Sequence, residues 1–282
     1  MSDGRALARA FLEQQRVLGG DAVVVSETDA AAGTPAPSRG PNPAPPAAAR
    51  GPSGAGGAPG APPAAPHSSP AAPGALPPLP PPGLSYDPPG GDLFATDPVQ
   101  QAGSLAAIAE LVAACTKCRL CESRSRTVPG EGPTDARLVV VGEGPGRVED
   151  QTGRPFVGQA GELLTKILAA IELPRERVFI CNVVKCRPPE NRVPQYDEVA
   201  ACLPYLFRQI ELLKPQVILA MGGTAAQALL DTKQSLGALR NLLHRFRGIP
   251  VIVTYHPAAL LRNPNWKKPT WDDVRIARRL LS

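Results

Sequence analysis

A glycine-rich segment, Gly142–Gly161, carries several side chains that could take part in chemistry. It follows the apolar run Leu138–Val141, which predicts a buried strand. The glycines let the backbone approach a ligand closely, and the segment supplies two carboxylates, Glu143 and Glu149, and one aromatic ring, Phe156. A ligand could therefore meet backbone amides, hydrogen-bond acceptors and a stacking face together. Our hypothesis is that this ligand is a nucleobase turned out of its strand.

Two further polar residues lie within or directly after predicted strands. Asn182 is the one amide in the apolar run Phe179–Val184. A buried amide must be paired, so Asn182 either bonds neighbouring backbone or reads the edge of a base with its donor and its acceptor. His256 follows the apolar run Val251–Tyr255, and the proline after it is typical of the first position of a helix. An isolated histidine is usually structural, but a position at the end of a strand favours a functional role.

The six cysteines indicate metal ligands or core thiols rather than disulfides if the compartment is reducing. Cys115, Cys118 and Cys121 are spaced like part of a ferredoxin ligand run, whereas Cys186 and Cys202 flank a later loop. Thiolates that converge from these two segments could bind either zinc or an iron–sulfur cluster, and the spacing does not decide between them. The alternative is a set of unrelated core thiols.

Basic residues and two leucines form a second group of candidates, for contact with nucleic acid. The candidates are Lys185, Arg187, Arg192, Arg262, Leu260 and Leu261. Charge alone favours a solvated surface over phosphate contacts for the basic residues, and the net charge of +5 is too modest to name a partner. In a DNA-binding enzyme, an apolar side chain of the adjacent leucines could enter the base stack left by a flipped base. Without that context both leucines are ordinary core residues.

Alternating apolar runs and helical patterns must position these residues. The predicted strands are Arg137–Val141, Val178–Val184, Val217–Met221 and Val251–Thr254, and the predicted helices are Ser104–Ala114, Gly161–Ile171, Tyr196–Leu213, Thr224–Leu230 and Trp271–Leu281. Short strands separated by helices indicate parallel pairing, so the predicted fold class is α/β, an α/β/α sandwich. Helical spacing also covers Leu239–Phe246, which makes His244 a surface or packing residue of a helix.

Ligands of such sheets bind beyond the carboxyl ends of the strands. That edge would bring together Glu143, Asn182, the turn Gly222–Thr224 and His256. The turn either contacts a phosphate through the helix N-terminus or merely starts a helix.

Composition divides the chain into three parts. Residues 1–20 predict a short amphipathic helix, which docks on an unknown protein or on the rest of the chain, or has no separate function. Residues 21–100 are rich in Pro, Ala and Gly and predict a disordered linker. Residues 101–282 predict one catalytic domain with a metal cluster. Because no membrane span or secretory signal is recognised, we expect a cytoplasmic protein that does not associate with membranes. We also expect a monomer.

Four motifs together resemble the family 4 uracil-DNA glycosylases, the iron–sulfur branch of the uracil-DNA glycosylase superfamily. The motifs are Gly142–Gly146, Gly153–Gly161, Cys186–Pro194 and His256–Leu261, and the resemblance extends from Ala113 to the C-terminus. It implies a four-stranded parallel sheet and a [4Fe–4S] cluster. The ligand pattern of the family falls on Cys115, Cys118, Cys186 and Cys202, and it leaves out Cys121 and Cys181.

The resemblance also implies roles for individual residues. Phe156 would stack on the uracil, Asn182 would hydrogen-bond its polar edge, and His256 would donate to its O2. Glu149 falls where the family excludes the 5-methyl group of thymine. Gly144 is a departure from the best-known branch of the superfamily, which has an aspartate at this position.

The implied activity is hydrolysis of the bond between uracil and deoxyribose in uracil-containing DNA, which leaves an abasic site for repair by base excision. The departing base gains negative charge, so stabilising that anion matters more than a strong nucleophile. Because Gly144 cannot orient water, Glu143 is our candidate for that task. Amides of the loop that starts at Gly142 would share the anion. The alternatives are a glycosylase that also removes hypoxanthine or xanthine, a non-catalytic metal-containing nucleic-acid-binding module, and a relative that traps the sugar covalently.

Overall fold

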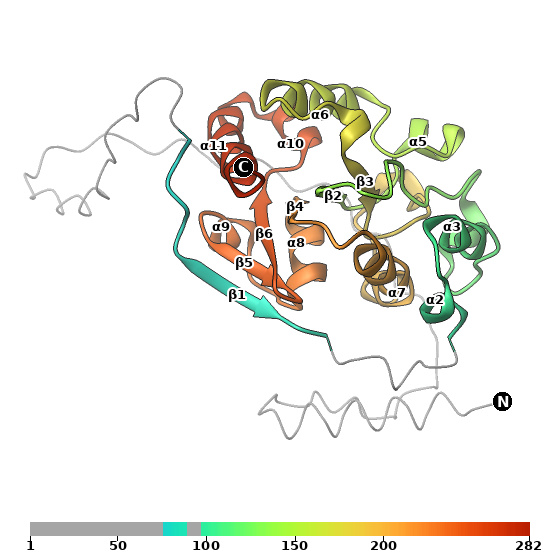
Figure 1. Cartoon of the computed structure of the whole chain (residues 1–282). Helices are drawn as coiled ribbons and strands as arrows, with labels where there is room; N and C mark the ends of the chain where they lie inside the picture. Colours follow the sequence, from blue (N-terminus) through green and yellow to red (C-terminus); the bar gives the residue numbers. More distant parts are fainter. Residues whose placement is uncertain (1–75, 89–96) are drawn as a thin grey trace, which may run out of the picture. The chain divides into compact units, whose positions relative to one another are not determined.

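A six-stranded sheet lies at the centre of the protein, whose computed structural model describes residues 76–88 and 97–282 (Figure 1). The strands are β1 (Pro82–Tyr86), β2 (Leu138–Gly142), β3 (Phe179–Asn182), β4 (Val217–Met221), β5 (Leu243–Phe246) and β6 (Ile249–Thr254), in the order β1-β5-β6-β4-β2-β3. The helix predicted within residues 1–20, and most of the predicted linker, lie outside the described residues.

The expected four-stranded parallel sheet is only part of the observed one. Strands β3, β2, β4 and β6 are parallel to one another. Strand β5 then pairs antiparallel with β6, and β1 pairs parallel with β5. The sheet is therefore mixed and has six strands, which corrects the prediction.

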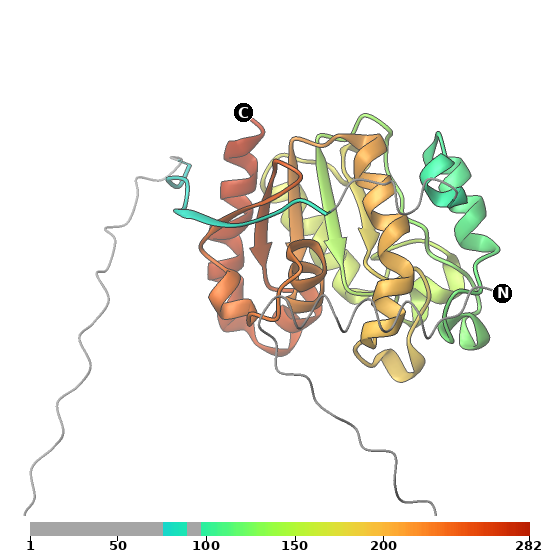
Figure 2. The same cartoon turned by 90° about the horizontal axis from the view of Figure 1, so that it is seen from below.

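Helices cover both faces of the sheet (Figure 2). They are α2 (Pro98–Gln101), α3 (Leu105–Ala113), α4 (Leu120–Ser123), α5 (Arg147–Thr152), α6 (Gln159–Ala170), α7 (Tyr196–Leu213), α8 (Gly223–Leu230), α9 (Leu236–Leu239), α10 (Pro257–Arg262) and α11 (Lys267–Leu280), with short 3-10 turns η2 (Arg175–Arg177), η3 (Pro189–Asn191) and η4 (Pro264–Trp266). No helix in the described ranges is long and apolar enough to cross a membrane.

Two hydrophobic cores follow from the two faces of the apolar strands. In β2, Val139 and Val141 face the core formed with α3, α7 and α8, whereas Leu138 and Val140 face the core formed with α6 and α11. Side chains of a strand alternate between faces, so an all-apolar strand must be covered on both. The α/β/α layering is therefore the arrangement that buries these runs.

Strand β5 occupies residues for which helical spacing predicted a helix. Only Leu236–Leu239 is helical, as α9, and the chain then extends. His244 is fully buried in β5, where its Nδ1 accepts a hydrogen bond from the Leu84 N–H at 2.9 Å and its Nε2 lies 2.7 Å from the Leu239 carbonyl oxygen. His244 is thus a packing residue, as one expectation had it, but of a strand. Its two bonds hold β1 and α9 to β5.

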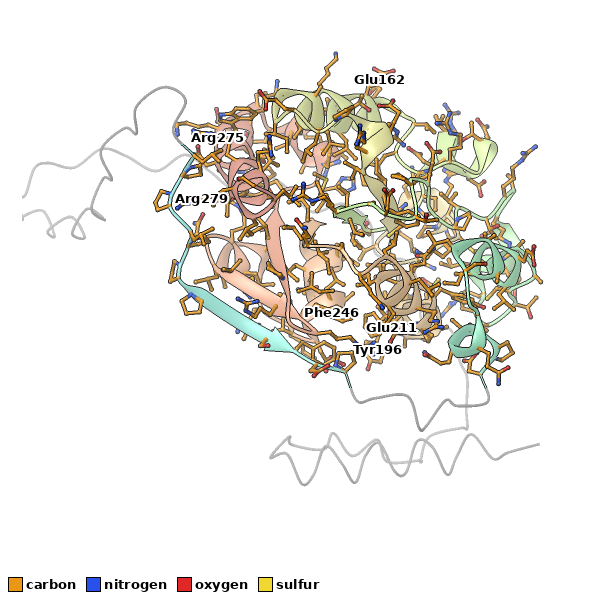
Figure 3. The ribbon with its side chains drawn as sticks, viewed as in Figure 1. Glu162, Tyr196, Glu211, Phe246, Arg275 and Arg279 are labelled. Carbon is orange, nitrogen blue, oxygen red and sulfur yellow. The ribbon has the colours of Figure 1, made fainter. Side chains whose placement is uncertain are left out.

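Strand β1 lies within residues 21–100, the range predicted as a disordered linker, and corrects that prediction for Pro82–Tyr86. The ring of Tyr86 lies 6.3 Å from that of Phe246, which in turn packs on α7. Figure 3 labels Phe246 near Glu211 of α7, whose carboxylate pairs with Arg247. Arg279, also labelled there, donates from α11 to the Pro77 carbonyl oxygen at 2.7 Å. These contacts hold the segment from Pro77 to Tyr86 against β5 and α11.

The carboxyl ends of the parallel strands meet at one edge of the sheet, as predicted. Gly142 at the end of β2 is in register with Asn182 at the end of β3, and Met221 of β4 is in register with Thr254 of β6. The segments that follow contain two short helices: α5, inside the glycine-rich segment, and α10, which begins at the proline predicted to open a helix. This edge is where the candidate site lies.

Candidate active site

A cleft of about 540 Å³ opens at the carboxyl edge of β2, β3, β4 and β6. Its lining includes Glu143, Gly144, Glu149, Phe156, Asn182, Arg192, Gly222, His256 and Arg262. The rule for ligand sites in open α/β sheets thus located the site correctly. The cleft is large enough for a base and part of its sugar.

Asn182 presents an unpaired acceptor to the cleft. Its side chain is 2% exposed, and its Oδ1 has no hydrogen-bond partner within the described part of the chain. The structure therefore does not support the alternative that this oxygen bonds neighbouring backbone. A Cβ atom on Gly142 would lie 2.4 Å from this Oδ1, so only glycine leaves room for the amide. A buried acceptor without a donor costs about 1–3 kcal/mol, and a ligand that donates here recovers that cost.

Phe156 forms a wall of the cleft in a strained backbone conformation. Its φ is 51°, which is uncommon for a residue with a side chain. The ring lies 5.4 Å from the His256 ring, tilted by 32°. A Cβ on Gly142 would lie 2.5 Å from Phe156 Cζ, so the same glycine that admits the Asn182 amide admits this ring.

His256 is neutral with its proton on Nε2. Nδ1 accepts a hydrogen bond from the Ala258 N–H at 3.2 Å, which leaves Nε2 as the donor of a neutral ring. Burial and, to a smaller extent, the charge of Arg262 lower the pKa of His256 to about 4, while Glu149 acts in the opposite direction. His256 also caps helix α10. The cleft therefore contains a neutral imidazole N–H.

Glu143 follows β2 and is held by the start of helix α8. The Thr224 hydroxyl donates to Glu143 Oε2 at 2.5 Å. Gly222, the residue before α8, has a φ of 96°, which favours glycine and lets the chain turn from β4 into the helix. The turn at Gly222 therefore starts a helix and also fixes the carboxylate at the cleft.

Glu149 lies on α5, and its carboxylate caps α6. Its Oε1 accepts hydrogen bonds from the N–H groups of Val157 and Gly158, both at 3.0 Å. Gly158 is the N-cap of α6, so a negative charge sits at the positive end of that helix. The carboxylate thereby fixes the chain directly after Phe156, in addition to lining the cleft.

Lys185, a predicted DNA contact, is instead a buried residue. Its side chain is 1% exposed, and Nζ donates to the Asn182 carbonyl oxygen at 2.8 Å and to Gln209 Oε1 at 2.7 Å. It cannot reach a phosphate in solvent. The prediction is wrong because sequence alone does not show which way a lysine beside a basic loop points. Here the side chain points inward, and its ammonium group bonds the carbonyl oxygen of the last residue of β3.

Two of the three predicted DNA-contacting arginines, Arg187 and Arg192, form hydrogen bonds within the protein. Both Nη atoms of Arg192 bond the carboxylate of the fully buried Glu198, at 2.6 and 2.8 Å. Arg187 donates to Asn191 Oδ1 at 2.8 Å. Arg262 lines the cleft from α10. Arg192 therefore anchors the loop to α7 while it borders the cleft.

The two predicted wedge leucines differ in exposure. Leu260 is 1% exposed, so it belongs to the core and cannot enter DNA. Leu261 is 48% exposed. Because the segment is the helix α10, consecutive residues point in different directions, and only Leu261 keeps the predicted orientation.

A second cavity is lined by five of the six cysteines. They are Cys115, Cys118, Cys121, Cys186 and Cys202. The four predicted ligands therefore lie around one cavity, and Cys121 borders it too. Cys181 lies apart, buried in β3. The alternative of unrelated core thiols does not fit this convergence.

Several N–H groups point at the sulfur atoms of this cavity. Arg124 Nη1 lies 3.2 Å from Cys186 Sγ, and the Lys185 N–H donates to Cys202 Sγ at 3.3 Å. Burial raises the pKa of Cys202 to about 12 and also raises the pKa of Cys118 and of Cys186. Without a bound cation, burial therefore favours the neutral thiol form at these cysteines. Among the residues that the structure describes, no three cysteine, histidine or acidic side chains are close enough to hold one metal ion.

Two functional candidates were missed by the sequence reasoning. Glu131 and Arg175 form a polar network behind Phe156. A signal for Glu131 was present: the tetrapeptide Gly-Glu-Gly-Pro occurs at residues 130–133 as well as at residues 142–145. For Arg175, in a turn between α6 and β3, the sequence offers no signal.

Comparison with known proteins identifies the family. The model of the uracil DNA glycosylase superfamily matches residues 129–276, just over half of the chain. The chain belongs to the uracil-DNA glycosylase superfamily. The matched residues contain the whole rim of the cleft from Glu143 to Arg262.

Individual relatives refine the place of the chain within this superfamily. A type-4 uracil-DNA glycosylase of Thermotoga maritima is 51% identical over 158 residues, which cover 55% of this chain and 82% of the relative. A type-4 uracil-DNA glycosylase of Pyrobaculum aerophilum is 48% identical over 163 residues, 55% of this chain and 83% of the relative. A type-5 uracil-DNA glycosylase of the same organism is 32% identical over 152 residues, 48% of this chain and 67% of the relative. The similarity to the type-4 proteins agrees with the resemblance that the motifs indicated.

Proposed function

We propose that the protein is a DNA repair glycosylase that hydrolyses the bond between uracil and deoxyribose and leaves an abasic site. Membership of the superfamily and the similarity to type-4 uracil-DNA glycosylases support this activity. The observation that carries the proposal is the buried, unpaired Oδ1 of Asn182 beside the ring of Phe156. A planar base with an N–H group on its edge satisfies both.

Asn182 accounts for the choice of base. Its Oδ1 accepts from N3–H of uracil, and its side-chain NH₂ donates to O4. Cytosine offers an acceptor at N3 and a donor at position 4, so it would leave the Asn182 amide with two mismatched contacts. A site with a buried polar group left unpaired rejects such an analogue strongly. Phe156 provides the stacking face for either base, so discrimination falls to the amide.

His256 stabilises the departing base. As the glycosidic bond breaks, negative charge develops on the uracil, and a neutral Nε2–H donor directed at O2 stabilises it in the transition state. A neutral donor suits this task because it needs no counter-charge before the reaction. Amides of the loop at Gly142–Gly146 contribute in the same way.

Glu143 orients the attacking water. The hydroxyl of Thr224 occupies Oε2, so Oε1 is the oxygen that accepts from water. This assignment gives the carboxylate a fixed direction, although Gly144 offers no side chain of its own.

We infer further that Cys115, Cys118, Cys186 and Cys202 hold a [4Fe–4S] cluster. In such a cluster each thiolate binds a different iron, so the sulfur atoms need not converge on one point, whereas a zinc ion needs its ligands within about 2.3 Å. Four cysteines around one cavity, without three donors close enough for one ion, fit the cluster better than zinc. These four cysteines would hold the cluster between the segment before α4, helix α7 and the start of the loop that follows Cys186. Iron and sulfide analysis and the visible absorption spectrum of anaerobically purified protein test this; zinc without iron contradicts it.

For DNA contact we propose Arg187 and Arg262 at phosphates and Leu261 at the base stack. Arg262 lines the cleft, Arg187 donates to Asn191, which lines it too, and Leu261 is exposed next to Arg262 in α10. We also propose that the protein acts as a cytoplasmic monomer on uracil-containing DNA, at the nucleoid during repair.

One experiment separates the candidate activities. Purified protein is incubated with an oligonucleotide that contains one uracil, treated with alkali and resolved on a denaturing gel. Strand scission after alkali supports the glycosylase, no scission with retained binding supports a non-catalytic module, and a stable protein–DNA adduct supports covalent trapping. Parallel oligonucleotides with cytosine, thymine and hypoxanthine define the range of bases.

A further inference from the structure

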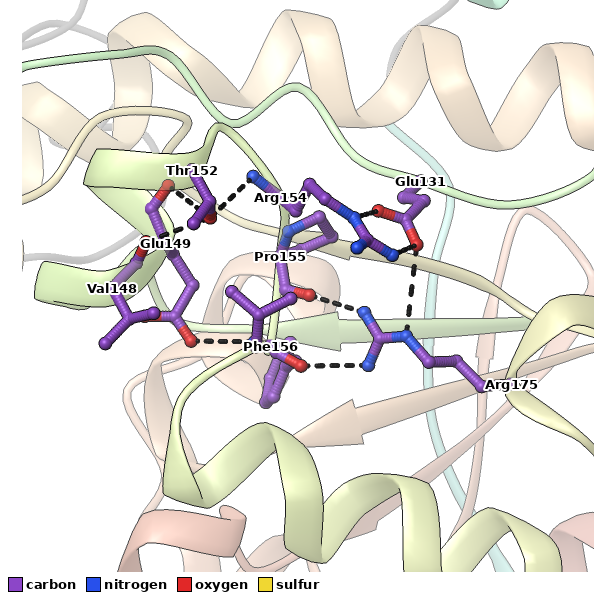
Figure 4. A network of polar contacts seen from close by, with 9 residues as sticks. Glu131, Val148, Glu149, Thr152, Arg154, Pro155, Phe156 and Arg175 are labelled. Atoms are coloured by element: carbon purple, nitrogen blue, oxygen red, sulfur yellow. Dashed lines mark hydrogen bonds and ion pairs between the residues drawn. The ribbon is translucent and has the colours of Figure 1, made fainter.

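A polar network behind Phe156 ties the stacking wall of the cleft to the strand that ends in Asn182 (Figure 4). Arg175 Nη1 donates to the Phe156 carbonyl oxygen at 2.9 Å, and Nη2 donates to the Pro155 carbonyl oxygen at 2.6 Å. Arg175 Nε lies 3.9 Å from the Glu131 carboxylate. We call Arg175 and Glu131 the arginine clamp.

Glu131 is itself fixed to β3. Its N–H donates to the Ile180 carbonyl oxygen at 2.9 Å, and its carbonyl oxygen accepts from the Ile180 N–H at 2.8 Å. Ile180 is two residues before Asn182 in the same strand. The glycines on either side of Glu131 have φ values of 131° and 145°, which favour glycine and place this segment against β3. The clamp therefore joins the segment that carries the stacking ring of Phe156 to the strand that carries the Asn182 amide.

The backbone at Phe156 needs such support. A residue with a side chain at positive φ is strained and persists only where its surroundings hold it. The clamp holds the carbonyl oxygen of Phe156, and Glu149 holds the N–H of Val157 on the other side of the same peptide. The Arg175 side chain is 12% exposed, and its two carbonyl bonds use the planar fork of the guanidinium.

We propose that Arg175 is a positioning residue for uracil. It acts by holding the Phe156 ring at the distance from Asn182 that one base fills. The proposal deepens the proposed function and rests on it. Arg175 does not line the cleft itself, and its two hydrogen bonds go to the Pro155 and Phe156 carbonyl oxygens, so the proposed route to a bound base is through Phe156. A lysine cannot replace the fork, because one ammonium group does not bond two carbonyl oxygens in the same geometry.

The test compares Arg175→Ala and Arg175→Lys with Arg177→Ala, an exposed arginine of the same turn. Three quantities are measured: the single-turnover rate of uracil excision, the inhibition constant of free uracil, and the affinity for DNA with a stable abasic-site analogue. We expect Arg175→Ala to lower the rate by about 100-fold, as misplacement of a binding group by an ångström does. Free uracil should inhibit roughly tenfold less well, as expected when base–aromatic stacking is partly lost.

Affinity for the abasic analogue should stay unchanged, because that DNA has no base to stack on Phe156. Arg175→Lys should fall between Arg175→Ala and the wild type, and Arg177→Ala should match the wild type. In a Phe156→Ala background, Arg175→Ala should change uracil inhibition little further, because the ring through which Arg175 acts on the base is already absent. A simple loss of fold would instead weaken all three quantities together.

The outcomes that overturn the proposal are distinct from failure of the proposed function. If the wild type excises uracil and Arg175→Ala leaves uracil inhibition unchanged, the clamp does not position the base. The same conclusion follows if the full effect persists without the Phe156 ring, or if abasic DNA binding falls in parallel. If Arg175→Ala does not fold, Arg175→Lys and Glu131→Gln decide by the same measurements. Wild-type protein that leaves uracil in the oligonucleotide contradicts the glycosylase activity itself.

Discussion

The protonation of His256 sets the acid limit of the reaction at the scale of single residues. Burial lowers its pKa to about 4, so the ring remains a neutral Nε2–H donor well below pH 6.5. We expect the single-turnover rate of excision to show no titration of this group between pH about 5 and 8, and to fall only near pH 4. A pH profile measured with saturating enzyme checks this. An acid limb centred near 6.5, the ordinary value, would contradict the neutral-donor assignment.

The same pKa makes folding stability depend on pH. Between pH 6.5 and about 4, the unfolded chain binds a proton at His256 that the folded protein refuses. The stability that this neutral histidine supports is therefore complete above pH 6.5 and is lost as the pH falls toward 4. We expect His256→Asn, which keeps a side-chain cap for α10, to reduce this pH dependence. Urea unfolding at several pH values measures the free energy of unfolding as a function of pH. The same dependence on pH in the variant and in the wild type would contradict the prediction.

Asn182 should decide between uracil and cytosine. In Asn182→Asp the side chain loses its NH₂ donor to O4, so we expect uracil excision to fall by about 100-fold or more. A buried, protonated aspartic acid donates to N3 of cytosine, so the ratio of cytosine to uracil excision should rise. The matched control is Asn191→Asp, which lines the same cleft but has Oδ1 bonded by Arg187. Unchanged uracil excision in Asn182→Asp would remove the amide from the mechanism.

Residue types at strand ends could be predicted from sequence, but burial could not. Asn182 and His256 stood out because Asn182 is the one amide within an apolar run and His256 directly follows another. Lys185 and Leu260 were assigned to the DNA surface because sequence reports charge and hydropathy, not the direction in which a turn or a helix points a side chain. Both are 1% exposed. Their directions are set by contacts with residues far away in sequence, such as that of Lys185 with Gln209.

At the scale of elements, the start of helix α6 fixes the stacking wall. A Cβ on Gly161 would lie 1.9 Å from the Phe156 carbonyl oxygen, so Gly161→Ala must push α6 away from that peptide. We expect excision to fall by about 100-fold and stability by about 1–3 kcal/mol, or a few degrees in Tm. Gly103→Ala is the control, because its Cβ meets nothing within 4 Å. Wild-type excision by Gly161→Ala would show that the Phe156 peptide tolerates displacement.

The sequence predicted those elements whose patterns are unambiguous. The buried runs of β2 and β4 have no reading other than a core strand between helices. Strand β5 was missed because Leu239, Leu243 and Phe246 are also spaced for a helix, and four residues are too few to separate the two periods. Strand β1 was missed because prolines surround it, and its pairing depends on a buried histidine of β5. Local pattern loses to tertiary contact at both strands.

At the scale of the whole molecule, the sheet divides into a catalytic and a supporting half. The parallel strands β3, β2, β4 and β6 carry the rim of the cleft, while β5 and β1 continue the sheet away from it. The helices on the two faces pack against the sheet in two hydrophobic cores, and each core includes residues of both halves. Contacts of β1 should therefore affect stability without entering the chemistry.

Truncation tests this division. A chain that begins at Leu76 keeps β1, whereas a chain that begins at Asp97 removes it and takes away the Leu84 N–H that bonds the buried His244 and the Tyr86 ring that packs on Phe246. Leaving the buried imidazole acceptor unpaired costs about 1–3 kcal/mol, which corresponds to a Tm lower by roughly 2–12 °C for a chain of this size. We expect the chain from Leu76 to match the full-length protein in Tm, and both truncations to excise uracil at the same rate at low temperature. Equal Tm values for the two truncations would show that β1 does not support the sheet, and loss of excision without a change in Tm would show that β1 reaches the chemistry after all.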